Sequence, residues 1–361
     1  MAEETPDEAH WPDRREGAPH PREALALFGQ EAAEREALLA WDRLPAGWLL
    51  AGPEGVGKAT LAYRLAGSLL AGGPRPVALG LPPEHPDARL VRAGAHPRLL
   101  VVRRSPDDKG RLRTQITVED ARRLGPFLGL SAADGGRRVV LVDASDDLNP
   151  SAANALLKLL EEPPARAHLL LVAHRPARLL PTIRSRCRVL RLQPLAPPDL
   201  GRALAAIGLE GGGEALAELA GGSVGRAVDL LAGGGLEVAA EVVALLSTLP
   251  RLDRAGALRL AESCAGRGAE ARLSLVLDLL DALLARLARA GLGLRPAAEA
   301  APGEAALHAR LAPSPAAARL WAEAQGRAVP AARAGRGVNL DPAALLLDTL
   351  LQIEDAARRA A

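Results

Sequence analysis

The sequence predicts an α/β domain built on a parallel sheet, followed by a small helical domain and a larger all-helical one. Up to about residue 193, short apolar runs alternate with segments of helical periodicity, which is the pattern of βαβ units whose sheet is buried on both faces. After residue 194, apolar runs of strand length give way to successive helical patterns. The 361 residues are enough chain for two or three domains with cores of their own.

The elements of the predicted α/β domain follow in a regular order. A helix over residues 23–41 comes first, and a glycine-rich stretch leads into a second helix over 59–70. Two more helices are expected over 118–128 and 150–162. Asn149 can cap the latter, and the two prolines that follow it end it. The apolar runs that we expect to form strands are residues 47–51, 99–102, 138–142, 169–172 and 189–192.

Composition and periodicity also divide the chain. The first 22 residues hold six acidic residues, four prolines and one large apolar group, so we expect a disordered tail there. Near the other end, an apolar stripe at helical spacing runs from Leu273 to Leu287, with Asp278, Asp281 and Arg286 between, which indicates packed helices. The expected parts are a tail, 1–22, an α/β domain, 23–193, a small helical domain, 194–235, and a C-terminal helical domain, 236–361.

The overall composition excludes several classes of protein. Hydrophobic residues make up 48% and charged residues 24%, as in soluble globular proteins, and no run approaches the ~18 apolar residues of a transmembrane helix. The N-terminus carries no export signal, so we expect a cytoplasmic protein without a membrane partner. A formal charge of +2 and 2% aromatic residues argue against unaided wrapping of nucleic acid or stacking on single strands. Cys187 and Cys264 are too few for a disulfide framework or a cysteine-based zinc site.

Residues 52–60, GPEGVGKAT, have the pattern of a phosphate-binding loop between a strand and a helix. Gly52, Gly55 and Gly57 allow backbone N–H groups to converge on phosphate oxygens, and Lys58 supplies a point charge. Lysine is scarce, with three among 45 basic residues, so a lysine at this position indicates a need for an ammonium group. We therefore expect ATP or ADP to bind here. The alternative is an ordinary glycine-rich connection that carries a lysine by chance.

Two catalytic positions of such a site are altered. The Mg²⁺-binding hydroxyl belongs directly after the lysine, where this chain has Ala59, and Thr60 lies about 100° further around the helix. Asp143 ends a predicted strand and can anchor Mg²⁺, unless it is only a turn or capping residue. The water-orienting Glu expected beside it is Ala144. We expect weak magnesium binding and no useful ATP hydrolysis. Asp146 or Asp147 could supply the missing carboxylate only if their loop bends back toward the site.

Longer motifs carry a resemblance to a known family. Residues 154–164, NALLKLLEEPP, and 179–187, LLPTIRSRC, resemble the bacterial clamp-loader AAA+ family, and so do residues 222–227, GSVGRA, and 339–342, NLDP. The resemblance covers roughly residues 24–361. It implies an AAA+ P-loop domain, a helical lid over 194–235, and a C-terminal collar over 236–361 that joins subunits into a ring.

The resemblance also implies roles for single residues. Ser185, Arg186 and Cys187 match the family's Ser-Arg-Cys motif, whose arginine reaches ATP in the neighbouring subunit. Without the resemblance, Arg186 would be one of several arginines on a solvated strand edge. Arg226 matches the lid arginine that senses nucleotide within its own subunit. His174 falls near the position of a small polar nucleotide sensor in relatives. Many relatives also carry a four-cysteine zinc module between the two nucleotide motifs, which this chain lacks, so zinc is not expected.

The resulting functional hypothesis is a stator subunit of the clamp loader. By resemblance, it joins gamma/tau and delta subunits in a pentameric ring that opens the sliding clamp and places it on primed DNA, as part of the DNA polymerase III holoenzyme. No polymerase metal site is visible in the sequence. Three alternatives remain open: a gamma/tau-type motor subunit, an autonomous AAA+ ATPase, and an interaction protein with a vestigial phosphate loop. The basic loop over residues 103–113 is either a solvated loop or a DNA contact.

Overall fold

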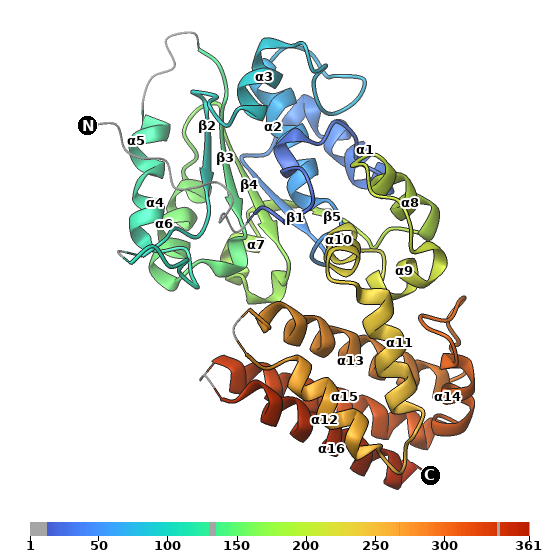
Figure 1. Ribbon diagram of the computed structural model, residues 1–361. Helices are drawn as coiled ribbons and strands as arrows, with labels where there is room; N and C mark the ends of the chain where they lie inside the picture. The colour runs from blue at the N-terminus through green and yellow to red at the C-terminus, as the bar shows by residue number, and fades with distance from the viewer. Residues whose placement is uncertain (1–12, 108, 130–134, 267, 338–339, 361) are drawn as a thin grey trace. The chain divides into compact units, whose positions relative to one another are not determined.

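The computed structural model of the chain describes residues 13–360 except 108, 130–134, 267 and 338–339 (Figure 1). The described residues form two compact units. The first holds the residues up to Leu209 together with Gly222–Gly225, and the second holds Glu210–Gly221 and the residues from Arg226 on. The segment expected to form a lid, 194–235, is shared between the two units, so a separate lid domain stays a prediction.

The first unit is built on a five-stranded sheet in the order β2-β3-β4-β1-β5, in which every neighbouring pair is parallel. This arrangement confirms the predicted α/β fold class. Strands β1 and β4 are buried along their whole length, and β3 is buried except at its two ends, so all three read as continuous apolar runs in the sequence. The strands are β1 (Gly47–Ala51), β2 (Leu99–Val102), β3 (Arg138–Asp143), β4 (Ala167–Ala173) and β5 (Cys187–Arg191).

Helices cover both faces of this sheet, since successive residues of a strand point to opposite sides. Leu49, Val140 and Leu169 pack with residues of α4, α5 and α6 into one apolar core. Helix α2 contacts β1, β3 and β4, and Figure 1 shows it on the other side of the sheet. The helices of this unit are α1 (Glu31–Leu39), α2 (Lys58–Ala71), α3 (Pro86–Arg92), α4 (Val118–Arg122), α5 (Leu124–Gly129), α6 (Pro150–Glu161), α7 (Pro181–Arg184) and α8 (Pro197–Ala205).

Helix α6 begins as its sequence predicts. Asn149 accepts a hydrogen bond from the Ala152 N–H through its side-chain oxygen at 2.8 Å, and Pro150 is the first helical residue. The helix buries Leu156 and Leu160 in the core of the sheet and ends at Glu161, which is exposed. The acidic end of the 154–164 motif is thereby presented at the surface of the unit.

Residues 13–22 differ from the expected disordered tail. The side chain of Asp13 is 1% exposed, accepts a hydrogen bond from Arg103 Nη1 at 2.6 Å, and lies 3.2 Å from His20 Nε2. The His20 ring packs edge-on against Tyr63 of α2, with 5.7 Å between ring centroids. This segment buries little apolar surface, and ionic contacts hold it in place. Residues 1–12 lie outside the described part of the chain.

All the regular elements among the described residues of the second unit are helices. The predicted stripe from Leu273 to Leu287 is confirmed: each of its apolar residues is at most 2% exposed, and helix α13 packs against α15 and α16. Among the described residues, no helix is long and apolar enough to cross a membrane. The helices are α9 (Gly213–Ala220), α10 (Val224–Ala232, which starts in the first unit), α11 (Gly235–Leu246), α12 (Arg254–Ser263), α13 (Glu270–Gly291), α14 (Glu304–Leu311), α15 (Pro315–Gly337) and α16 (Pro342–Ala360).

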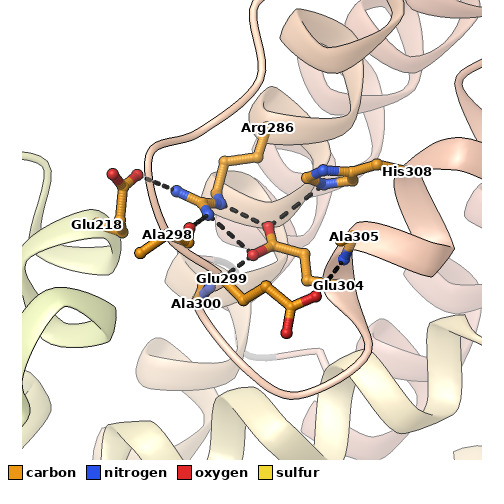
Figure 2. Close-up of polar contacts among 8 residues, drawn as sticks. All are labelled: Glu218, Arg286, Ala298, Glu299, Ala300, Glu304, Ala305 and His308. Atoms are coloured by element: carbon orange, nitrogen blue, oxygen red, sulfur yellow. Dashed lines mark hydrogen bonds and ion pairs between the residues drawn. The ribbon is translucent and has the colours of Figure 1, made fainter.

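A buried ionic cluster joins three elements of the second unit (Figure 2). Arg286 of α13 is 2% exposed and donates to both carboxylate oxygens of Glu304, one at 2.8 Å, to the Ala298 carbonyl at 2.8 Å, and to Glu218 of α9. Burial by itself would raise the pKa of Glu304, but hydrogen bonds from His308, Arg286 and the Ala300 N–H lower it to about 2. Arg286 therefore lies inside the unit, where two carboxylates and a carbonyl accept its hydrogen bonds.

Candidate functional site

Residues 52–60 form the loop that links strand β1 to helix α2, so the strand–loop–helix context of a phosphate-binding loop is present. This loop requires glycine at two positions because other parts of the chain approach its backbone closely. A Cβ at Gly52 would collide with the Leu192 carbonyl, and a Cβ at Gly55, where φ is +76°, would collide with the Ser223 hydroxyl. The first N–H groups of α2, and the positive end of its dipole, adjoin this loop.

Lys58 is the first residue of α2 and is only 3% exposed. Its ammonium group donates to the carbonyl of Pro53, inside the loop. Burial lowers the pKa of Lys58 to about 8, against the opposing effect of the Asp143 and Glu54 carboxylates. The loop therefore encloses a cation whose charge the protein itself does not fully compensate, which is the condition that favours a bound anion.

Asp143 is the last residue of strand β3, the position at which a magnesium anchor is expected. Burial raises its pKa to about 7, the Asp13 carboxylate raises it further, and Lys58 and Arg103 act in the opposite direction. Lys58 and Asp143 are thus both shifted toward their neutral forms instead of holding each other ionised. Paired shifts of this kind are found at many functional sites.

The altered catalytic positions lie at the expected places in this site. Ala59 and Thr60 are half-buried in the first turn of α2, directly after the lysine. Ala144, which follows Asp143, is 6% exposed and offers no carboxylate to orient a water molecule. The chain therefore lacks, in this unit, both the hydroxyl and the acid that hydrolysis by such a site requires.

Two neighbouring carboxylates are engaged elsewhere. Asp146 accepts hydrogen bonds from the backbone N–H groups of His174 and Arg175, at 3.0 and 3.1 Å. Asp147 forms an ion pair with Arg104 at 3.2 Å. Both carboxylates already have partners in the loops that follow β2 and β4. Asp146 instead fixes the position of His174, whose pKa is lowered by burial and then by Lys58.

Arg186 is exposed and lies between helix α7 and strand β5. Its Nη2 forms an ion pair with Glu161 at 2.9 Å, and its Nη1 donates to the Thr182 carbonyl at 3.1 Å. Glu161 belongs to the other half of the sequence motif, so the structure brings the two motif segments together. The guanidinium is held at the surface of the unit by a carboxylate, a group that matches it as phosphate oxygens do.

The sheet register separates Arg186 from the phosphate-binding loop of its own chain. Gly47 pairs with Cys187 at the amino ends of the parallel strands β1 and β5, and the loop follows Ala51 at the carboxyl end. Five residues of strand span roughly 16 Å at about 3.3 Å per residue. Arg186 consequently lies at the amino ends of the parallel strands, and Lys58 lies beyond their carboxyl ends.

The two residues that flank Arg186 support the backbone around it. The Ser185 hydroxyl donates to the Thr182 carbonyl at 3.0 Å, closing the turn after α7. Cys187 begins β5, and burial raises the pKa of its thiol to about 12, so the thiol stays protonated. Cys264 is buried in the second unit. The described residues contain no group of three or more His, Cys, Asp or Glu side chains that could hold a metal ion.

The residues of the 222–227 motif are divided between the two units. In the first unit, the Ser223 hydroxyl donates to the Glu54 carbonyl at 2.9 Å and the Gly225 N–H donates to the Gly55 carbonyl at 3.3 Å, so this segment braces the phosphate-binding loop. Arg226 belongs to the second unit, where it donates to the Asp278 carbonyl of α13 at 2.8 Å. Its role as a nucleotide sensor stays a prediction.

Sequence reasoning missed one part of this site, the segment around Asp13 and Arg15. Asp13 is close enough to Asp143 to raise its pKa, and Arg15 forms an ion pair with Glu54 of the loop. The only signal in the sequence was the density of charges in residues 13–22, which equally fits a solvated tail.

Comparisons with known proteins give one family for the first unit. Residues 32–196 match the family described as DNA polymerase III, delta subunit. The DNA polymerase III subunit delta′ of Pseudomonas aeruginosa is 44% identical over 140 residues, which are 39% of this chain and 40% of that protein. The subunit delta′ of Escherichia coli is 42% identical over 110 residues, 30% of each protein. The subunit delta′ of Bacillus subtilis is 33% identical over 158 residues, 43% of this chain and 44% of that protein.

These alignments leave most of each protein unmatched. The chain spans less than half the length of each of these relatives. The matched family region contains strands β1 to β5, the phosphate-binding loop and Arg186, and it excludes Arg226 and the helices from α8 on.

Proposed function

We propose that the chain is the delta′-type stator of a bacterial clamp loader, because its residues 32–196 match the family described as DNA polymerase III, delta subunit. In this role it joins gamma/tau and delta subunits in a pentameric ring in the cytoplasm. The ring loads the sliding clamp onto primed DNA. The chain contributes an arginine finger to a neighbouring subunit and hydrolyses no ATP at a useful rate itself.

The position of Arg186 carries this proposal. An exposed guanidinium at the amino edge of the sheet, opposite the loop that follows β1, can act only on a nucleotide that another subunit holds. Its chemistry suits that role, because guanidinium is permanently charged, planar and bidentate toward phosphate oxygens. In the separate chain, the Arg186 guanidinium forms an ion pair with Glu161 at 2.9 Å. A neighbour's phosphate would take the place of that carboxylate.

The chain's own loop supports the same division of work. Lys58, with its pKa lowered to about 8, can attract the phosphates of ATP or ADP. Ala59 and Ala144 leave magnesium with one anchor, Asp143, and leave the attacking water without a base. We therefore propose weak nucleotide binding, poor magnesium retention and no resident zinc.

Purification with candidate partners tests this proposal. The tagged full chain, co-expressed with the gamma/tau and delta subunits of its own organism, should be recovered in a stable complex with both. The isolated chain should show no turnover above background. An isolated chain with a kcat within the ordinary enzyme range of about 1–10³ s⁻¹ would support the motor alternative instead. Failure to join the other subunits would contradict the proposal.

A further inference from the structure

The N-terminal segment of the first unit lies against the phosphate-binding loop on two sides. Arg15 forms an ion pair with Glu54, and its Nε would lie 2.6 Å from a Cβ built on Gly225, the residue that braces the loop. Two residues earlier, Asp13 reaches Arg103 at the end of β2 and raises the pKa of Asp143 at the end of β3. Residues 13–15 thus run from the carboxyl ends of these strands to the phosphate-binding loop. In a site of this type, bound phosphates lie between the strand ends and the loop.

The Asp13 carboxylate is a buried anion near the ends of these strands. Its side chain is 1% exposed, and one oxygen is held by Arg103 at 2.6 Å and lies 3.2 Å from His20. The second oxygen, Oδ1, is buried and makes no hydrogen bond with any of the described residues. Although burial raises the pKa of Asp13, the contacts with His20 and Arg103 lower it by more, so the group stays anionic. A buried anion with an unmet acceptor is poorly satisfied by its own fold.

A nucleotide and this carboxylate exclude each other. Both are anions, and in a desolvated site two like charges a few ångströms apart repel strongly. Arg103 follows β2 and, while the segment is docked, its Nη1 is engaged by Asp13. Glu54, within the loop, is likewise tied to Arg15 while the segment is docked.

We propose that residues 13–15 are an internal competitor for the nucleotide site, so that ATP or ADP binds only after this segment leaves the loop. The inference rests on the part of the proposed function that treats residues 52–60 as a nucleotide site. It does not depend on the trans role of Arg186. If the segment is docked in more than nine molecules of ten, the apparent affinity of the chain for ATP or ADP is lowered by at least about ten-fold.

Binding of a fluorescent ATP analogue, mant-ATP, to the full-length chain tests the inference by anisotropy. The double variant D13A/R15A should bind at least about ten-fold more tightly than the wild type. D13N, which removes the charge and keeps the side-chain volume, should give a smaller gain in the same direction. R188A is the matched control, because it breaks an exposed arginine–glutamate pair of the same unit away from the loop, and it should leave the affinity unchanged.

Two further measurements locate the effect. Adding K58A to the double variant should abolish the gain, and saturating ATP should increase hydrogen exchange of residues 13–22 in the wild type. The inference is overturned if D13A/R15A binds no better than the wild type, including the case in which neither binds, or if the gain survives K58A. Either result would leave the proposed stator role intact, since that role is judged by assembly and by Arg186.

Discussion

The two compact units each contain a buried ionic cluster, and the clusters behave in opposite ways. In the second unit, Glu304 is surrounded by donors and its pKa falls to about 2, so it is firmly ionised. In the first unit, the pKa of Lys58 falls to about 8 and that of Asp143 rises to about 7, so both are shifted toward neutrality. A structural cluster satisfies its own charges, whereas a binding site leaves them for a ligand to satisfy.

The opposite pKa shifts of the two clusters follow from how many hydrogen bonds their charged groups make. Arg286 donates to two carboxylates and a carbonyl, and Glu304 also accepts from the Ala300 N–H at 2.6 Å (Figure 2). Lys58 donates to the neutral Pro53 carbonyl and so gains little to offset the loss of water. The Arg286 cluster should therefore stabilise the second unit, whereas the cluster of Lys58 and Asp143 should destabilise the first unit.

Breaking the Arg286 cluster should have the largest effect on stability. R286M keeps much of the side-chain volume but leaves Glu304 buried without its main partner, a change that typically lowers the free energy of unfolding by about 3–5 kcal/mol. Urea unfolding of the full chain, followed by circular dichroism, measures it. The control R333A breaks a half-exposed pair with Asp278 and should lower stability by under about 1 kcal/mol. Similar losses in the two variants would contradict the structural role of the cluster.

Acid should weaken the same cluster in a predictable window. The pKa of Glu304 in the folded chain, about 2, lies below its ordinary value of 4.5. Its contribution is therefore fully present above pH 4.5 and is lost as the pH falls through that value toward 2. The free energy of unfolding of E304Q should differ most from that of the wild type near pH 6, and the two should converge toward pH 2. A difference that does not depend on pH would show that Glu304 does not titrate as described.

Removing a charge from the loop cluster should change the stability in the opposite direction. The pKa of Asp143 in the folded chain, about 7, lies above its ordinary value of 3.8. The stability linked to its proton is present below pH 3.8 and is lost as the pH rises through 7. D143N should accordingly be more stable than the wild type at pH 8 and should match it below pH 4. A destabilised D143N at pH 8 would mean that Asp143 serves the fold rather than a ligand.

The sequence predicted the sheet well because its central strands are buried on both faces, which makes runs such as residues 47–51 and 138–142 continuously apolar. It also located the start of α6, because Asn149 and Pro150 are local signals. The Arg286 cluster could not be predicted in this way. Its partners come from helices 18 and 68 positions away in the chain, and nothing local selects them among 43 acidic residues.

The candidate site was predictable to a similar extent. The loop and Lys58 follow from a short motif in the right context, and Arg186 follows from the resemblance to clamp-loader proteins. The pairing of Asp146 with the backbone after β4, and the docking of Asp13 beside Asp143, depend on which loops meet at the carboxyl edge of the sheet. Long-range ionic contacts of this kind leave no periodic signal.

ATP hydrolysis by the assembled loader tests the central claim most directly, with R186A, K58A and R188A introduced into this chain alone. We predict that R186A forms the complex normally but lowers its DNA-stimulated ATP hydrolysis. The loss should be smaller than the roughly 10³–10⁵-fold effect of a single arginine finger, because the other sites of the ring keep theirs. K58A and R188A should stay close to the wild type. A crippled K58A complex beside a normal R186A complex would show that the chain is a motor and not a stator.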